Sequence, residues 1–132
     1  MLLVLGDSLS AAYGMDAAQG WVALLQSRLA SQGHPHRVVN ASVSGETTSG
    51  GLARLPALLR QHHPAIVVVA LGGNDGLSGL PVKQLRANLT AMIEAARAQG
   101  ARVLLAGVRL PPNYGAAYAE QFQRVYQDIA RT

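Results

Sequence analysis

Short apolar runs alternate with longer stretches of helical periodicity along the whole chain, and this alternation restricts the fold more than any other feature. The apolar runs predict four β-strands. The run AIVVVAL is the clearest of them, because it is β-branched, uncharged and bounded by a proline and a Gly-Gly pair. The predicted strands are Leu2–Leu5, Arg37–Asn40, Ala65–Leu71 and Arg102–Val108.

Each predicted strand is followed by a stretch whose apolar residues recur every three or four positions, which predicts a helix. These stretches are residues 19–30, 52–62, 85–99 and 118–129. Continuous apolar strands separated by helices are typical of a parallel sheet covered on both faces. We therefore expect a single α/β domain over residues 1–132, in which the loops that follow the strands share one edge of the sheet.

The composition narrows the class of protein. The formal net charge is +4, but the 11 Lys and Arg residues are scattered, which argues against a nucleic-acid partner. There is no cysteine, so disulfides, thiolate catalysis and Cys-based metal sites are excluded. No apolar run approaches the roughly 20 residues that span a bilayer. The chain opens directly in a strand, which fits either a cytoplasmic protein or one whose signal peptide has been removed.

Three loops that follow predicted strands carry the residue types that acyl transfer requires. Ser8 offers a hydroxyl nucleophile and its own backbone N–H, in the loop GDSLS. Gly45, in SVSGETT, offers a backbone N–H with no side chain in the way, and Asn74, in GGNDG, offers an amide donor. A nucleophile with donors aimed at the developing oxyanion is what a tetrahedral intermediate needs.

Taken singly, each loop has a simpler interpretation. Gly-Asp-Ser after a strand is often a turn whose Asp or Ser caps the next helix, and Gly-Gly-Asn-Asp is an ordinary tight turn. Thr47 and Thr48 could serve only to start a helix. The three loops together favour the catalytic interpretation.

The same loops resemble known sequence blocks. GDSLS, SGETT and GGND are similar to blocks I, II and III of the GDSL/SGNH hydrolases. The longer stretches VVNASVSGETTSGGLARLPALL and VRLPPNYG resemble the bacterial branch of that family that contains thioesterase I, lysophospholipase and arylesterase. The resemblance implies a three-layer αβα, flavodoxin-like fold and a reaction that needs no cofactor or metal.

The resemblance also implies roles for single residues. Ser8 would be the nucleophile, and Ser8, Gly45 and Asn74 would form the oxyanion hole, supported by Asp7 and Asp75. The acyl-chain groove would lie beside the 76–81 loop, with Gly76, Leu77, Leu110 and Tyr114 as substrate contacts. The implied substrates are small acyl esters, thioesters, aryl esters or lysophospholipids, and the implied compartment is the periplasm.

The fourth block of the family, Asp-x-x-His, has no counterpart in this sequence. His34 and His36 precede a predicted strand, while His62 and His63 end a helix that carries them roughly 18 Å from its start. We therefore expect all four histidines at the edge opposite Ser8, beyond hydrogen-bond reach. The expected domain is C-terminally truncated, lacks the last strand and helix of the family, and hydrolyses esters weakly or not at all.

Without a further strand, the apolar fourth strand would be an unprotected sheet edge. This predicts either dimerisation or aggregation through the edge, or a natural C-terminal segment beyond this sequence that covers it. Two other functions use a similar α/β order. A non-catalytic acyl-binding module would fit the missing base. A signalling receiver domain would need paired acids after its first strand and a lysine after a fifth strand, whereas the only lysine, Lys83, lies early in a predicted helix.

Overall fold

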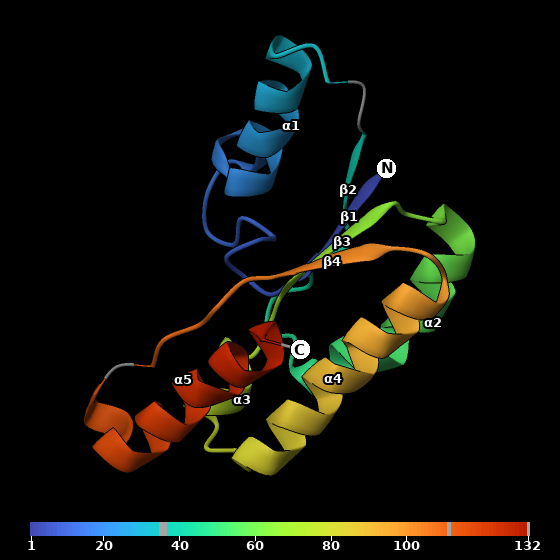
Figure 1. Cartoon of the computed structure of the whole chain (residues 1–132). Coiled ribbons are helices and arrows are strands. Elements are labelled where there is room, and N and C mark those ends of the chain that lie inside the picture. Colours follow the sequence, from blue (N-terminus) through green and yellow to red (C-terminus); the bar gives the residue numbers. More distant parts are fainter. Residues whose placement is uncertain (35–36, 111, 132) are drawn as a thin grey trace.

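A parallel four-stranded sheet forms the centre of the molecule, with the strands in the order β2-β1-β3-β4 (Figure 1). The structure is a computed structural model, and it describes residues 1–34, 37–110 and 112–131. The four predicted strands are confirmed. The strands are β1 Leu2–Gly6, β2 Val38–Asn40, β3 Ile66–Ala70 and β4 Arg102–Leu105.

Strand β4 ends three residues before the expected Val108. Ala106 N–H still donates to the Val69 carbonyl at 2.9 Å, but β3 itself ends at Ala70 and offers β4 no further ladder partner. After β4 the chain therefore leaves the sheet, and the next helical segments are Pro112–Tyr114 and Ala116–Ala130 (Figure 1).

The four predicted helices are confirmed, and one short helix was not expected. Helix α2 begins earlier than predicted because the Thr47 hydroxyl accepts a hydrogen bond from Gly50 N–H and caps it. The unexpected helix, α3, contains only five residues, which is too short to show a helical period. The helices are α1 Trp21–Ser31, α2 Thr48–His62, α3 Gly73–Leu77, α4 Val82–Ala98 and α5 Ala116–Ala130, with single 3₁₀ turns at Ala17–Gln19 and Pro112–Tyr114.

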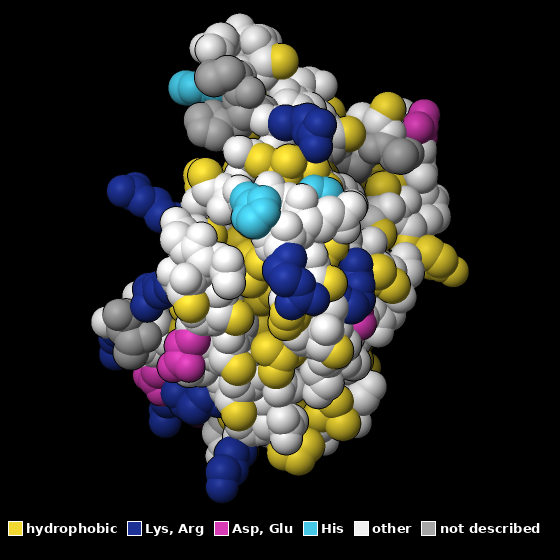
Figure 2. All heavy atoms as spheres, turned by 90° about the vertical axis from the view of Figure 1, so that its right-hand side faces the viewer, with side chains coloured by type: hydrophobic (Ala, Val, Ile, Leu, Met, Phe, Trp, Pro, Cys, Tyr) yellow, Lys and Arg dark blue, Asp and Glu magenta, His cyan; other side chains and the backbone are white. Residues whose placement is uncertain are grey.

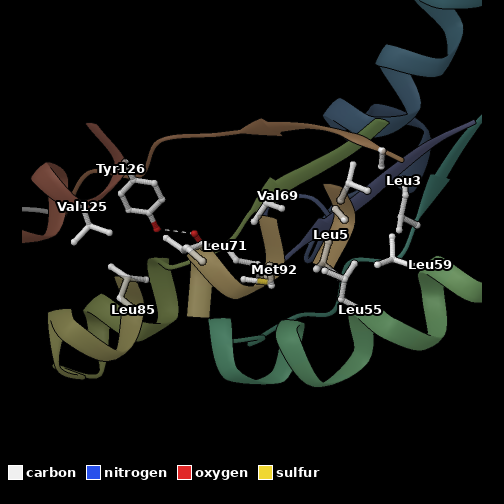
Figure 3. Packing of buried hydrophobic residues seen from close by; sticks show 14 of the residues in the cluster. Leu3, Leu5, Leu55, Leu59, Val69, Leu71, Leu85, Met92, Val125 and Tyr126 are labelled. Atoms are coloured by element: carbon white, nitrogen blue, oxygen red, sulfur yellow. Dashed lines mark hydrogen bonds between the residues drawn. The ribbon is translucent and has the colours of Figure 1, made fainter. Parts of the chain in front are cut away.

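The main core lies between one face of the sheet and helices α2, α4 and α5 (Figure 3). Alternate strand residues point to this face, as the two-residue period of a strand requires. Leu3 and Leu5 of β1, Val69 of β3 and Met92 of α4 are all fully buried there. This packing holds the carboxyl ends of β1 and β3 in place.

Helix α1 lies over the opposite face, so helices flank the sheet on both sides as expected, but this second face is covered only in part. Val22 of α1 packs on Val4 and Val68 in a small second cluster. Over β4, the side chain of Leu104 is 62% exposed. An open, mostly apolar pocket of about 430 Å³ lies between this part of the sheet and the loop after β1.

The basic side chains do not form one continuous stripe on the face shown in Figure 2, where apolar and uncharged atoms separate them. None of the described helices combines the length and the apolar composition needed to cross a membrane.

Tyr126 of α5 joins the core to the end of β3 (Figure 3). Its hydroxyl donates to the Leu71 carbonyl at 2.6 Å, and the residue is 5% exposed. Burial, together with the nearby Asp75 and Asp7 carboxylates, raises the pKa of Tyr126, so the hydroxyl stays neutral and remains a donor. A Cβ at Gly72 would lie 1.7 Å from this hydroxyl oxygen, which explains the glycine directly before α3.

Replacing this hydroxyl tests how much the end of β3 depends on it. We expect Tyr126→Phe to lower the free energy of unfolding by about 1–3 kcal/mol, because the Leu71 carbonyl loses its buried donor. Urea denaturation followed by circular dichroism measures the change. Tyr13→Phe is the matched control, since Tyr13 is 77% exposed, and it should leave the midpoint unchanged. Equal midpoints for the two variants would contradict the prediction.

Candidate active site

The pairing of β1 with β3 brings the first and third predicted loops to one edge of the sheet. Gly6 lies opposite Ala70 at the carboxyl ends of the two strands. The chain runs from β1 towards β2 and from β3 towards β4, in opposite directions across the sheet, so β1 and β3 flank the point where the strand order reverses. Open α/β sheets bind ligands at such a point.

The loop that carries Ser8 is held by its neighbours on both sides. Asp7, 8% exposed, accepts a hydrogen bond from Leu9 N–H at 3.2 Å, which closes a turn around Ser8. Ser10 is 2% exposed. Its hydroxyl accepts a hydrogen bond from Trp21 Nε1 at 3.0 Å, and its carbonyl accepts one from Asn40 Nδ2 at 2.8 Å. The residues around Ser8 are thus fixed, while Ser8 itself stays partly exposed.

Gly45 lies in a tight turn at the edge of the molecule. Glu46 N–H donates to the Val43 carbonyl at 3.1 Å, and Gly45 has a φ of +80°. That combination favours glycine at the third position of the turn. Nothing lies within 4 Å of the place where a Cβ of Gly45 would be, so its backbone is open to a ligand. Val43 N–H donates to the Gly6 carbonyl at 3.1 Å and ties this turn to the end of β1.

Asn74 connects the third loop to the second. It lies in the first turn of α3, and its Nδ2 donates to the Glu46 carbonyl at 2.9 Å. An amide nitrogen carries two N–H groups, so this bond leaves one for another acceptor. A Cβ at Gly73, the preceding residue, would lie 3.6 Å from Asp7 Oδ2, so the first and third loops also touch. All three predicted loops meet at this edge of the sheet.

Asp75 organises a buried polar network beneath the loops. It is 2% exposed, and its two carboxylate oxygens accept from Thr48 N–H at 2.8 Å and from the Thr48 hydroxyl at 2.6 Å. Asn88 of α4 donates to Thr48 Oγ1 at 3.0 Å and to Ser49 Oγ at 2.9 Å. Helices α2, α3 and α4 are thereby joined at the point where α2 begins.

The residues expected to line an acyl-chain groove lie in different settings. Gly76 is buried, and a Cβ there would lie 2.5 Å from Leu110 Cδ2, so these two residues pack on each other. Leu77 is 50% exposed and Tyr114 is 41% exposed. The 430 Å³ pocket beside the first loop is a different hollow; Asp7, Trp21 and Val108 are among the residues that line it.

The described histidines lie at the opposite edge of the sheet. His62 ends α2 and His63 follows it, and the chain then enters β3 at Ile66. His34 lies between α1 and β2. The length of a five-residue strand, about 13 Å, separates that edge from the loop of Ser8. His36 lies outside the described residues. Among the described residues, no group of three or more His, Asp or Glu side chains could hold a metal ion.

Comparison with known proteins identifies the family of the chain. Residues 4–132 match the GDSL-like lipase/acylhydrolase family. The chain belongs to this family. It is 63% identical to the esterase TesA of Pseudomonas aeruginosa over 98% of this chain and 64% of that protein. It is 49% identical to thioesterase 1/protease 1/lysophospholipase L1 of Escherichia coli K12 over 98% of this chain and 61% of that protein.

The fold of the family is shared as well. A crystal structure of TesA superposes with a TM-score of 0.96 at 62% sequence identity, over 98% of this chain and 72% of that one. The expected α/β fold with a parallel sheet is therefore confirmed. The chain spans 61–64% of the length of these curated family members.

Sequence reasoning missed several residues that position the loops, namely Ser10, Trp21, Asn40, Glu46, Arg54 and Asn88. Most of them act through hydrogen bonds between segments that are distant in the chain. Arg54 and Asn88 lie in helices, where a polar residue ordinarily indicates a solvated face. Only Asn88 has a signal in the sequence. It falls on the same helical stripe as Leu85 and Met92, which indicates that its side chain is buried.

Loss of the Asp75 carboxylate, at the centre of the network of Thr48, Asp75 and Asn88, should lower the stability of the fold. We expect Asp75→Asn to lower the free energy of unfolding by about 2–3 kcal/mol. An NH2 group then takes the place of one of the two carboxylate oxygens that accept from Thr48, so a buried acceptor is lost and a donor faces Thr48 instead. Thermal unfolding measured by calorimetry provides the value.

Asp128→Asn is the control for the lost charge. Asp128 accepts from Arg86 at the surface, with a side chain 39% exposed, and its loss should cost less than about 1 kcal/mol. A cost for Asp75→Asn as small as that of the control would show that the network does not hold the loops.

Proposed function

We propose that this chain carries the nucleophile and oxyanion-binding part of an ester or thioester hydrolase, with Ser8 as the nucleophile. The proposal rests mainly on the meeting of the Ser8, Gly45 and Asn74 loops at one sheet edge. The Gly45 loop is hydrogen-bonded both to Gly6 at the end of β1 and to Asn74. Membership of a family whose members include an esterase and a thioesterase supports the same class of reaction.

In the proposed reaction, Ser8 Oγ attacks the acyl carbonyl carbon and its proton passes to a base. The carbonyl oxygen becomes an oxyanion, which accepts hydrogen bonds from Ser8 N–H, Gly45 N–H and the second N–H of Asn74 Nδ2. Collapse of this intermediate breaks the bond to the leaving group, which takes the proton back from the base and departs as the alcohol or thiol, and leaves an ester on Ser8. Water then attacks that ester and releases the carboxylic acid.

The supporting residues have distinct proposed roles. Asp7 holds the turn around Ser8, and Asp75 holds the start of α2. We propose Leu77 and Tyr114 as contacts for the acyl chain because both expose apolar surface. Gly76 is buried and packs on Leu110, so we propose these two residues as the interior support of the acyl-chain contacts. The small acyl substrates and the periplasmic or secreted location that the family resemblance implies stay predictions.

A non-catalytic acyl-binding role is the second candidate. The observation that favours it is the position of the described histidines at the edge opposite Ser8. A serine hydroxyl is a weak nucleophile unless a nearby base accepts its proton. In such a protein the same donors would hold an acyl or acetyl carbonyl without cleaving it.

Hydrolysis of p-nitrophenyl butyrate distinguishes the two functions. If the chain is a hydrolase, Ser8→Ala should reduce turnover about a thousandfold or to background, because no other hydroxyl replaces the nucleophile. Ser27→Ala, an exposed serine of α1, is the control and should keep full activity. Equal turnover in the chain and in Ser8→Ala would reject the nucleophile, and saturable binding of butyrate without turnover would favour the binding module.

We also propose that two copies associate through β4. Its outer edge has no strand partner among the described residues, and Leu104 exposes an apolar side chain on the sheet face next to that edge. Leu104→Lys should shift sedimentation from dimer towards monomer. Leu24→Lys, on α1 with 57% exposure, is the matched control and should leave the distribution unchanged. A monomer at all concentrations of the unmodified chain would contradict the proposal.

A further inference from the structure

Arg54 of α2 forms hydrogen bonds to both ends of the turn that contains Gly45. Arg54 Nη1 donates to Glu46 Oε2 at 2.9 Å, and Arg54 Nη2 donates to the Ala41 carbonyl at 2.7 Å. The two acceptors lie on either side of residues 42–45. A planar guanidinium offers its two terminal nitrogens in a fixed geometry, so it holds these two points of the chain at a set separation.

The Glu46 carboxylate lies in the space that the missing side chain of Gly50 leaves free. A Cβ at Gly50 would lie 1.9 Å from Glu46 Oε1, so only glycine permits the carboxylate to lie against the first turn of α2. The side chain of Glu46 is 12% exposed and that of Arg54 is 35% exposed. This burial separates the pair from ordinary surface ion pairs, such as that of Arg124 and Glu120, whose side chains are 60% and 71% exposed.

Glu46 is also the residue through which the two proposed oxyanion donors are connected. Its backbone nitrogen is bonded to Gly45, and its carbonyl accepts the amide of Asn74 at 2.9 Å. A rotation of Glu46 would therefore move the Gly45 turn and the Asn74 side chain together. Its own side chain is the group that Arg54 holds.

From these contacts we infer that Arg54 and Glu46 are positioning residues, which set the Gly45 N–H and the Asn74 amide relative to each other. Neither acts on the substrate directly. This inference rests on the proposed oxyanion role of Gly45 and Asn74 for its catalytic meaning. The placement of the turn itself is a property of the chain whether or not it cleaves esters.

Amide hydrogen exchange by NMR on the whole chain tests the placement without any need for activity. Glu46 N–H, which donates to Val43, reports closure of the turn. Arg54→Gln and Gly50→Ala should each reduce protection of that amide about tenfold and shift the side-chain amide resonances of Asn74. Arg86→Gln removes a surface ion pair of α4 and is the control that should change neither signal.

The outcomes of the exchange experiment decide the inference. Unchanged protection and unchanged Asn74 resonances in both Arg54→Gln and Gly50→Ala would overturn it. An equal loss of protection at core amides such as Val69 would also overturn it, because that result means general destabilisation. A loss confined to residues 42–47 and Asn74 would support it.

An ester-hydrolysis assay on the same variants tests the catalytic meaning separately. If both proposals hold, Arg54→Gln should lower kcat about tenfold with little change in KM, since the donors act on the oxyanion in the transition state. Arg54→Lys should restore part of kcat because it keeps the charge opposite Glu46. A local loss of protection in a chain without Ser8-dependent turnover would contradict the hydrolase and leave the positioning supported.

The opposite outcome is full turnover in Arg54→Gln, in a chain whose activity depends on Ser8. The hydrolase would stand, and the catalytic consequence of the positioning would be rejected, while the exchange experiment alone would decide the placement of the turn.

Discussion

The parallel pairing of β1 with β3 is the constraint on which the rest of the site depends. Five residues of each strand are in register, and Gly6 and Ala70 form the last pair at the carboxyl edge. The Ser8 loop and the Asn74 helix leave the sheet from this pair. Both strands are buried by α2, α4 and α5 on the main face, so the pairing cannot slip by one residue without turning Leu3, Leu5 and Val69 out of the core.

Polar contacts then fix the positions of the neighbouring loops relative to one another. Asp75 joins the start of α2 to α3, Asn88 extends this network to α4, and Asn74 binds the backbone of the Gly45 turn. Such buried groups are costly unless each has a partner. The same network that satisfies them also limits how far the proposed oxyanion donors can move relative to Ser8.

The uneven cover of the sheet distinguishes this chain from a sheet protected on both sides. One face is packed by three helices, while the other carries α1 over β1 and β2 and a pocket over β3 and β4. That pocket lies beside the Ser8 loop and includes the buried carboxylate of Asp7.

The sequence by itself determined the strands, the helices and the loops that carry Ser8, Gly45 and Asn74, because periodicity and loop composition are local properties of the chain. It did not reveal α3, which is too short to show a period, or the early start of α2, which depends on the Thr47 cap. Only the tertiary structure decided that Arg54 spans Ala41 and Glu46 and that Gly50 makes room for a carboxylate. These contacts join residues from separate elements, and their geometry exists only after the sheet has brought those elements together.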